Sequence, residues 1–161
     1  MPSVIKNRQI VEDHWQTVAD DAELPAGPVI VSLARWQQER ATLRERGEPI
    51  GVQLPNTADV ADVADDLPAL ALVALEFPKF ADGRAYSQAR LLRERYGYRG
   101  EIRATGDVLR DQLFFMTRSG FDAFALRTDR SLTDALEAFN DFSESYQPAA
   151  DQPLPLYRRG R

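Results

Sequence analysis

The sequence predicts one α/β domain whose three layers enclose a mainly parallel sheet of about five strands, preceded by an N-terminal β-hairpin. Between residues 28 and 146, short apolar runs alternate with segments of helical periodicity, which is typical of βα units. A length of 161 residues is that of a single domain. Because periodicity does not encode strand order, the units fit either an open Rossmann-like or flavodoxin-like sheet or a partial βα barrel.

The hairpin is expected within residues 1–24, where two short apolar runs flank the pair Asn7-Arg8. A break containing proline and glycine at residues 25–28 separates this hairpin from the βα units. The domain is expected to end at residue 146, because residues 147–161 are rich in proline and end in arginines. Such a composition predicts an unstructured tail.

Five apolar runs, each bounded by glycine, proline or polar residues, are the predicted strands. Helical stripes of apolar residues lie between them and are expected to pack on the sheet. A last helix is predicted from Ser131, where Asp134 completes a capping box. The runs are Val29–Leu33, Ile50–Leu54, Leu70–Leu75, Ile102–Ala104 and Ala123–Leu126, and the stripes fall within residues 33–43, 60–67, 85–96 and 109–116.

Composition excludes several classes of function. A net charge of −5 argues against an overall basic surface for nucleic acid. Without cysteine and with one histidine, the chain has no thiolate nucleophile, Cys-ligated zinc, iron–sulfur cluster or histidine cluster for a metal. No cofactor is indicated, so redox chemistry would need a borrowed one. No apolar run reaches the roughly 20 residues of a membrane span, and no signal peptide is recognisable, so a cytoplasmic location is expected.

The candidate functional surface is the carboxyl edge of the predicted sheet, where open α/β folds place their ligands. Glu76 follows the most apolar run, at the point where that strand leaves the core. It is the candidate catalytic residue, as a general base or as a hydrogen-bond acceptor for a ligand. The structural alternative is an ion pair of Glu76 with Lys79 or Arg84.

The basic side chains after Glu76 suggest a second role for the same segment. Lys79, Arg84 and Arg90 could hold an oxyanion or phosphate near a helix that opens at Asp82 or Gly83. A solvated basic helix face and a docking surface for an acidic partner are the two alternatives. The candidate residues for binding a ligand or partner are Lys79, Asp82, Arg84, Tyr86, Ser87, Arg90, Arg103, Thr105, Asp107 and Arg127.

The segment Thr105-Gly106-Asp107 is similar to half of a phosphate-binding βα turn. Neither G-x-G-x-x-G nor G-x-x-x-x-G-K-[ST] occurs in the chain, so no nucleotide fingerprint supports that interpretation. The alternative is that Thr105 or Asp107 caps the following helix.

The longest recognisable motif is Leu75-Glu76-Phe77-Pro78-Lys79-Phe80, followed by Asp82-Gly83-Arg84 and Tyr86-Ser87-Gln88-Ala89-Arg90. It resembles the signature of bacterial domain-of-unknown-function family nine-three-four. Leu33-Ala34-Arg35-Trp36 and Leu154-Pro155-Leu156-Tyr157-Arg158 resemble the same family, so the likeness covers nearly the whole chain.

The resemblance implies an association with assimilatory sulfite reduction, because such proteins are typically encoded beside the sirohaem sulfite reductase. The label of oxidoreductase that members often carry rests on that neighbourhood, and no catalytic residue carries over. We expect an accessory protein that binds the sulfite reductase haemoprotein or its electron donor through residues 76–90. The alternatives are an enzyme or sensor for a small anion or phosphoryl ligand at Lys79, Arg84, Thr105 and Arg127, and an oxidoreductase with a borrowed flavin or nicotinamide.

Overall fold

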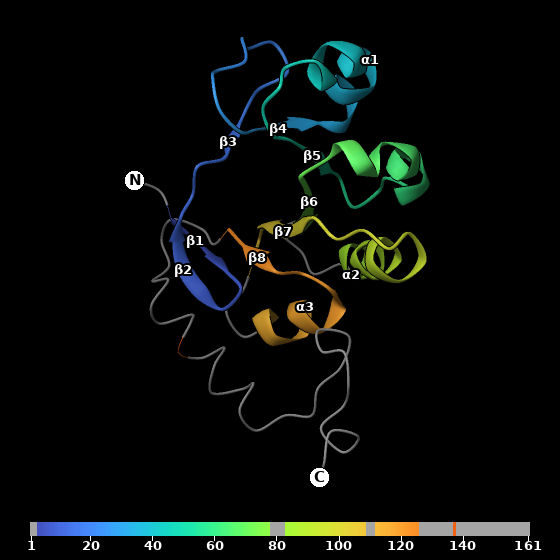
Figure 1. Ribbon diagram of the computed structural model, residues 1–161. Helices are drawn as coiled ribbons and strands as arrows, with labels where there is room; N and C mark the ends of the chain where they lie inside the picture. Colours follow the sequence, from blue (N-terminus) through green and yellow to red (C-terminus); the bar gives the residue numbers. More distant parts are fainter. Residues whose placement is uncertain (1–2, 78–82, 109–111, 126–136, 138–161) are drawn as a thin grey trace.

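The computed structural model describes residues 3–77, 83–108, 112–125 and 137 (Figure 1). In this part of the chain the strands form one eight-stranded sheet, in the order β2-β1-β8-β7-β6-β5-β4-β3. Strands β3 to β8 are parallel neighbours, whereas β1 pairs antiparallel with β2 and with β8. The strands are β1 (Ser3–Lys6), β2 (Gln9–Glu12), β3 (Gln16–Thr17), β4 (Val29–Ser32), β5 (Ile50–Leu54), β6 (Leu72–Phe77), β7 (Glu101–Gly106) and β8 (Ala123–Phe124).

The predicted three-layer fold with a mainly parallel sheet of about five strands is therefore wrong. Each of the five predicted runs overlaps a strand, but the N-terminal hairpin extends the same sheet and β3 adds a strand at the other edge. β4 to β8 also stand in sequential order, without the reversal that creates a doubly wound sheet. Because crossover connections between neighbouring parallel strands are right-handed, the helices come to lie on one side of the sheet. Figure 1 shows this for α1, α2 and α3.

The sheet is curled into a half-barrel. β2 and β3 lie at opposite edges, yet only residues 13–15 connect them. Eight strands laid flat would separate the two edges by about 34 Å. The extended chain from Glu12, the end of β2, to Gln16, the start of β3, spans at most about 14 Å. The short connection therefore requires curvature, and the curvature gives the sheet an outer face under the helices and an inner face that residues 13–15 cross.

The helical layer consists of α1 (Leu33–Arg44), the 3₁₀ helix η1 (Val60–Ala69), α2 (Arg84–Arg90) continued by the π-helical turn η2 (Leu91–Arg95), and α3 (Leu113–Ser119). Ser32 caps α1, because its hydroxyl accepts a hydrogen bond from the Arg35 amide at 3.0 Å. Gly120, with φ +119°, ends α3. Apart from the helical Glu137, the predicted last helix and the tail at 147–161 lie outside the described residues.

Residues of β6 alternate between the two faces of the sheet. Val73, Leu75 and Phe77 join the main core under the helices. Leu72 and Ala74 belong to a smaller cluster, which Trp15 covers. This alternation places Glu76 with the inner-face residues, at the carboxyl end of the strand. In the part of the chain that the structure describes, no helix is long and apolar enough to span a membrane.

Candidate functional site

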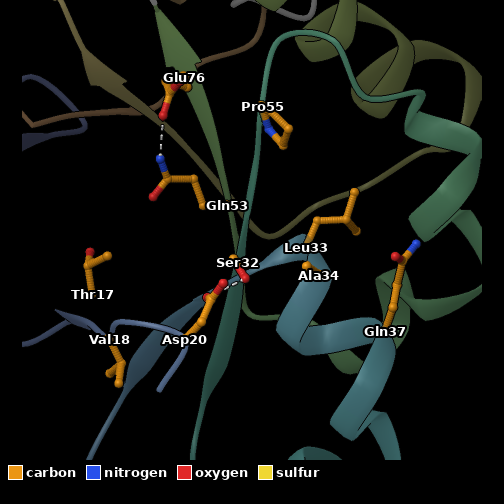
Figure 2. A pocket seen from close by; sticks show the side chains of 10 residues that line it. All are labelled: Thr17, Val18, Asp20, Ser32, Leu33, Ala34, Gln37, Gln53, Pro55 and Glu76. Carbon is orange, nitrogen blue, oxygen red and sulfur yellow. Dashed lines mark hydrogen bonds between the residues drawn. The ribbon is translucent and has the colours of Figure 1, made fainter. Parts of the chain in front are cut away.

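A cleft of about 470 Å³ opens at the carboxyl ends of β3, β4, β5 and β6, and it contains Glu76 (Figure 2). Its position agrees with the rule that open parallel sheets bind ligands at that edge. The volume lies in the range of small-molecule sites. The polar lining residues are Thr17, Asp20, Ser32, Gln37, Gln53 and Glu76, and the apolar ones are Val18, Leu33, Ala34 and Pro55.

Among the described residues, the hydrogen-bond partner of the Glu76 side chain is an amide and not a cation. Gln53 Nε2 donates a hydrogen bond to Glu76 Oε2 at 2.9 Å. Arg84 forms no ion pair with Glu76, and Lys79, the other partner that the structural alternative required, lies outside the described residues. The glutamate side chain therefore lines the cleft without an ion pair to any basic side chain of the described residues.

A second carboxylate lies beside the N-terminus of α1. Ser32 Oγ donates to Asp20 Oδ1 at 2.6 Å while accepting from the Arg35 amide. Arg35 Nη1 in turn donates to the Ala19 carbonyl oxygen at 2.8 Å, which fixes the loop that carries Asp20. The positive end of the helix dipole favours a carboxylate at this place.

Sequence reasoning missed Asp20, Ser32 and Gln53 as site residues. Ser32 could have been found, because a serine that directly follows an apolar strand and precedes a helical stripe is a typical N-cap. Gln53 is an inner-face residue at the end of β5, which the strand's alternation indicates. Asp20 carries no such signal, since it reaches the cleft only through the linker between β3 and β4.

The predicted site residues on α2 lie on the helical layer, away from the inner face. Ser87 and Arg90 line a hollow of about 550 Å³ together with Leu91, Glu94 and Arg95. Arg84 and Ser87 also line a hollow of about 370 Å³ beside Asn56 and Thr57. The predicted surface of residues 76–90 thus divides between the cleft, which takes Glu76, and the outer face of the helix.

Tyr86 has a structural role in the helical layer. Its hydroxyl donates to Gln112 Oε1 at 2.9 Å, and its ring packs edge-on against Phe77, with centroids 5.2 Å apart. Both contacts tie α2 to its neighbours. Lys79, Asp82 and Arg127, which were also predicted to bind a ligand or partner, lie outside the described residues.

The candidate residues on β7 and directly after it make internal contacts. Arg103 donates to both oxygens of Asp13, at 3.1 and 3.0 Å, and to Glu101 Oε2 at 2.8 Å. Thr105 Oγ1 donates a hydrogen bond to the Leu75 carbonyl oxygen at 3.4 Å. The Asp107 backbone amide donates to the Phe77 carbonyl oxygen at 2.8 Å. Arg103 therefore serves the inner face of the sheet and does not join the arginines of α2.

Three groups with shifted pKa values cluster near the amino ends of β7 and β8, opposite the cleft. Burial lowers the pKa of Arg93. Burial raises the pKa of Asp122, although the hydrogen bond from the Ile102 amide and the charge of Arg93 act in the opposite direction. Burial also raises the pKa of Tyr98, whose hydroxyl donates to the Leu70 carbonyl oxygen at 2.8 Å. Their contacts join the connections before β7 and β8, so this cluster stabilises the fold.

The cleft offers hydrogen-bond acceptors and negative charge more than reactive groups. Within residues 3–77, 83–108, 112–125 and 137, no three His, Cys, Asp or Glu side chains come together as a metal site. Asp20 and Glu76 are the carboxylates of the cleft, and each already accepts one side-chain hydrogen bond. The arrangement suits recognition of a ligand that donates hydrogen bonds.

Comparison with known proteins supports the resemblance seen in the sequence. A family model described as a bacterial protein of unknown function, DUF934, matches residues 51–157, more than half of the chain. No curated protein matches the chain. The matched span contains Glu76 and all of α2 and η2, whereas Asp20 and Ser32 precede it. The chain belongs to the DUF934 family of bacterial proteins of unknown function.

Proposed function

We propose that this protein is an accessory factor of assimilatory sulfite reduction, which binds the sulfite reductase haemoprotein or its electron donor through the outer face of α2 and η2. The genomic association implied by the family supports the pathway. The observation that carries the docking surface is a concentration of exposed arginine in an acidic chain. Residues 84–99 contain four exposed arginines and one acid, Glu94, which pairs with Arg90, although the whole protein has a net charge of −5. The fifth arginine of this segment, Arg93, donates to backbone carbonyl groups and is not counted in the surface.

An apolar side chain lies among these arginines. Leu91 is 39% exposed, and it lines the outer hollow with Ser87, Arg90 and Arg95. An exposed leucine surrounded by charged groups is a suitable anchor for a protein contact, because its burial removes apolar area from water while the arginines meet acidic groups. We call this surface, residues 87, 90, 91, 94 and 95, the basic face.

The backbone under the basic face is unusual. α2 changes to a π-helical turn at Leu91, and the turn continues to Arg95. π-helical turns occur frequently at functional sites. Here the turn keeps Leu92 fully buried while Leu91 faces solvent. The same segment lies within the span that matches the family.

The absence of cysteine supports a binding role over electron transfer by the chain's own groups. Thiol–disulfide exchange and cysteine-held iron–sulfur clusters both need that residue. An adaptor that positions the haemoprotein and its donor requires only a complementary surface. We therefore favour docking over redox catalysis.

The direct experiment measures binding of the purified chain to sulfite reductase and to its electron donor by biolayer interferometry at low and at physiological salt. We expect Arg90→Glu and Leu91→Ser each to weaken binding by about tenfold or more. Arg44→Glu and Phe115→Ser are the matched controls, because both residues are exposed elsewhere and Phe115 is 46% exposed. If the wild-type chain binds neither protein, the proposal is wrong.

A further inference from the structure

We infer that the cleft at the carboxyl ends of β3 to β6 binds a small organic cation, a primary ammonium or guanidinium group on a short aliphatic chain. This site is separate from the basic face, since it lies at the edge of the sheet and carries the opposite charge. The inference does not depend on the proposed role in sulfite reduction. It rests on three properties of the cleft: its acceptors, its charge and its apolar wall.

The polar groups of the cleft present acceptors. Gln53 uses its amide nitrogen to donate to Glu76, so its carbonyl oxygen remains as an acceptor. Ser32 likewise donates its only hydroxyl proton to Asp20. Within residues 3–77, 83–108 and 112–125, neither Glu76 Oε1 nor Asp20 Oδ2 accepts a hydrogen bond. Thr17, Gln37 and the second amide hydrogen of Gln53 can also donate, but the oxygens of Asp20, Gln53 and Glu76 give the cleft several acceptors, which suit the three donors of an ammonium group.

The charge of the cleft favours a cation. No basic side chain in the described part of the chain pairs with Asp20 or Glu76. The charge of Asp20 is partly compensated by the N-terminus of α1, whereas the partner of Glu76 among the described side chains is the neutral amide of Gln53. A concave, partly desolvated carboxylate concentrates its field toward the cleft. An anion such as sulfite would be repelled there.

The opposite wall accommodates carbon. Leu33, Ala34 and Pro55 line the cleft, with Val18 at one end. In Figure 2, the Gln53–Glu76 and Ser32–Asp20 pairs lie on one side, and Pro55 and Leu33 lie to their right. A short alkyl chain could cover these side chains while its charged end reaches Glu76. A volume of about 470 Å³ is sufficient for such a molecule.

The test titrates the full chain with four probes while recording amide NMR spectra: n-butylammonium, 1,4-diaminobutane, neutral 1-butanol and sulfite. We expect the two amines to bind and to shift the amide signals of Ser32, Leu33 and Gln53. Butanol and sulfite should leave these signals unchanged. Glu76→Gln keeps the shape of the side chain but removes its charge, and should weaken amine binding by about tenfold or more.

Glu45→Gln is the matched control, because Glu45 is an exposed acid at the other end of α1. This variant should bind the amines as the wild type does. Three results would overturn the inference: no amine binding at millimolar concentration, equal binding of butanol, or unchanged affinity in Glu76→Gln. Preferential binding of sulfite to these residues would overturn it as well. None of these results depends on whether sulfite reductase binds the basic face.

Discussion

Asp13 and Arg103 are 90 residues apart in the chain, and the Arg103 guanidinium Nη1 lies 3.1 and 3.0 Å from the two carboxylate oxygens of Asp13. The pair joins the connection between the two edge strands to the middle of the sheet. Arg103 is further held by Glu101, which also pairs with Lys6 at 2.9 Å. This chain of charges, which is buried at Arg103 and Glu101, fixes residues 13–15 across the inner face of the half-barrel.

We therefore expect Asp13→Asn to destabilise the protein by about 2–3 kcal/mol, because hydrogen bonds between charged groups are worth more than neutral ones. The side chain of Arg103 is 4% exposed, so water cannot replace the lost charge. Urea denaturation measures the change in unfolding free energy. The control is Asp21→Asn at an exposed position, which should change stability by less than about 0.5 kcal/mol. Equal stability of the two variants would contradict a bracing role for this pair.

Arg93 joins the helical layer to the connections before β7 and β8. Its Nε donates to the Gly120 carbonyl oxygen at 3.0 Å, and Nη1 donates to those of Tyr98 and Gly100 at 2.9 and 2.8 Å. A lysine has the charge but lacks the planar fork of donors. We expect Arg93→Lys to cost about 3 kcal/mol, since buried carbonyl groups lose their partners.

Arg99→Lys is the control for this substitution, because Arg99 is exposed. Thermal unfolding should leave the melting temperature of Arg99→Lys near that of the wild type and lower that of Arg93→Lys by several degrees. A melting temperature of Arg93→Lys near that of the wild type would show that charge alone stabilises these connections.

We expect Tyr98 to make the free energy of unfolding depend on pH in the alkaline range. Burial raises its pKa above the ordinary value of a tyrosine, so the unfolded chain releases this proton before the folded chain does. The contribution of Tyr98 to stability is therefore complete below the unfolded pKa and decreases as pH rises toward the folded one. Tyr98→Phe should cost about 1 kcal/mol at pH 7, through loss of the hydrogen bond to Leu70.

The informative quantity is the difference in unfolding free energy between wild type and Tyr98→Phe, measured by urea denaturation at pH 8 and pH 11. This difference should shrink as pH rises. Tyr96→Phe is the control, because Tyr96 is only partly buried and its difference from the wild type should not change in this way. A constant difference for Tyr98→Phe would contradict the prediction.

Gly106 allows β7 to approach the end of β6. Its φ is +85°, and a Cβ atom at this position would collide with the Phe77 carbonyl oxygen. We expect Gly106→Ala to cost about 2 kcal/mol or more, from the left-handed backbone and from the clash. Gly27→Ala separates the two effects, because Gly27 has φ +94° with no atom within 4 Å of the added methyl group. It should cost about 1 kcal/mol in the same denaturation assay. A larger loss at Gly27 than at Gly106 would contradict the clash.

The alternation of apolar runs and helical stripes predicted where the central strands lie. A short run without polar residues, such as residues 70–75, is typical of a strand that is covered on both faces of a sheet. It also predicted that Glu76 emerges at the carboxyl end of such a strand, which is where the structure has it. The family membership was visible in the same segment, since it depends on residue identities alone.

The order and curvature of the sheet were decided by the tertiary structure. Periodicity reports which residues are buried but not which strand lies beside which, so the hairpin's place at one edge and that of β3 at the other were not predictable. The cleft depends on that curvature. The curvature brings Asp20 to the same cleft as the end of β6, which carries Glu76. Glu76 was recognisable from sequence as an acid at the end of a core strand. Its neutral partner Gln53, in place of a cation among the described residues, depends on a contact between residues far apart in the chain.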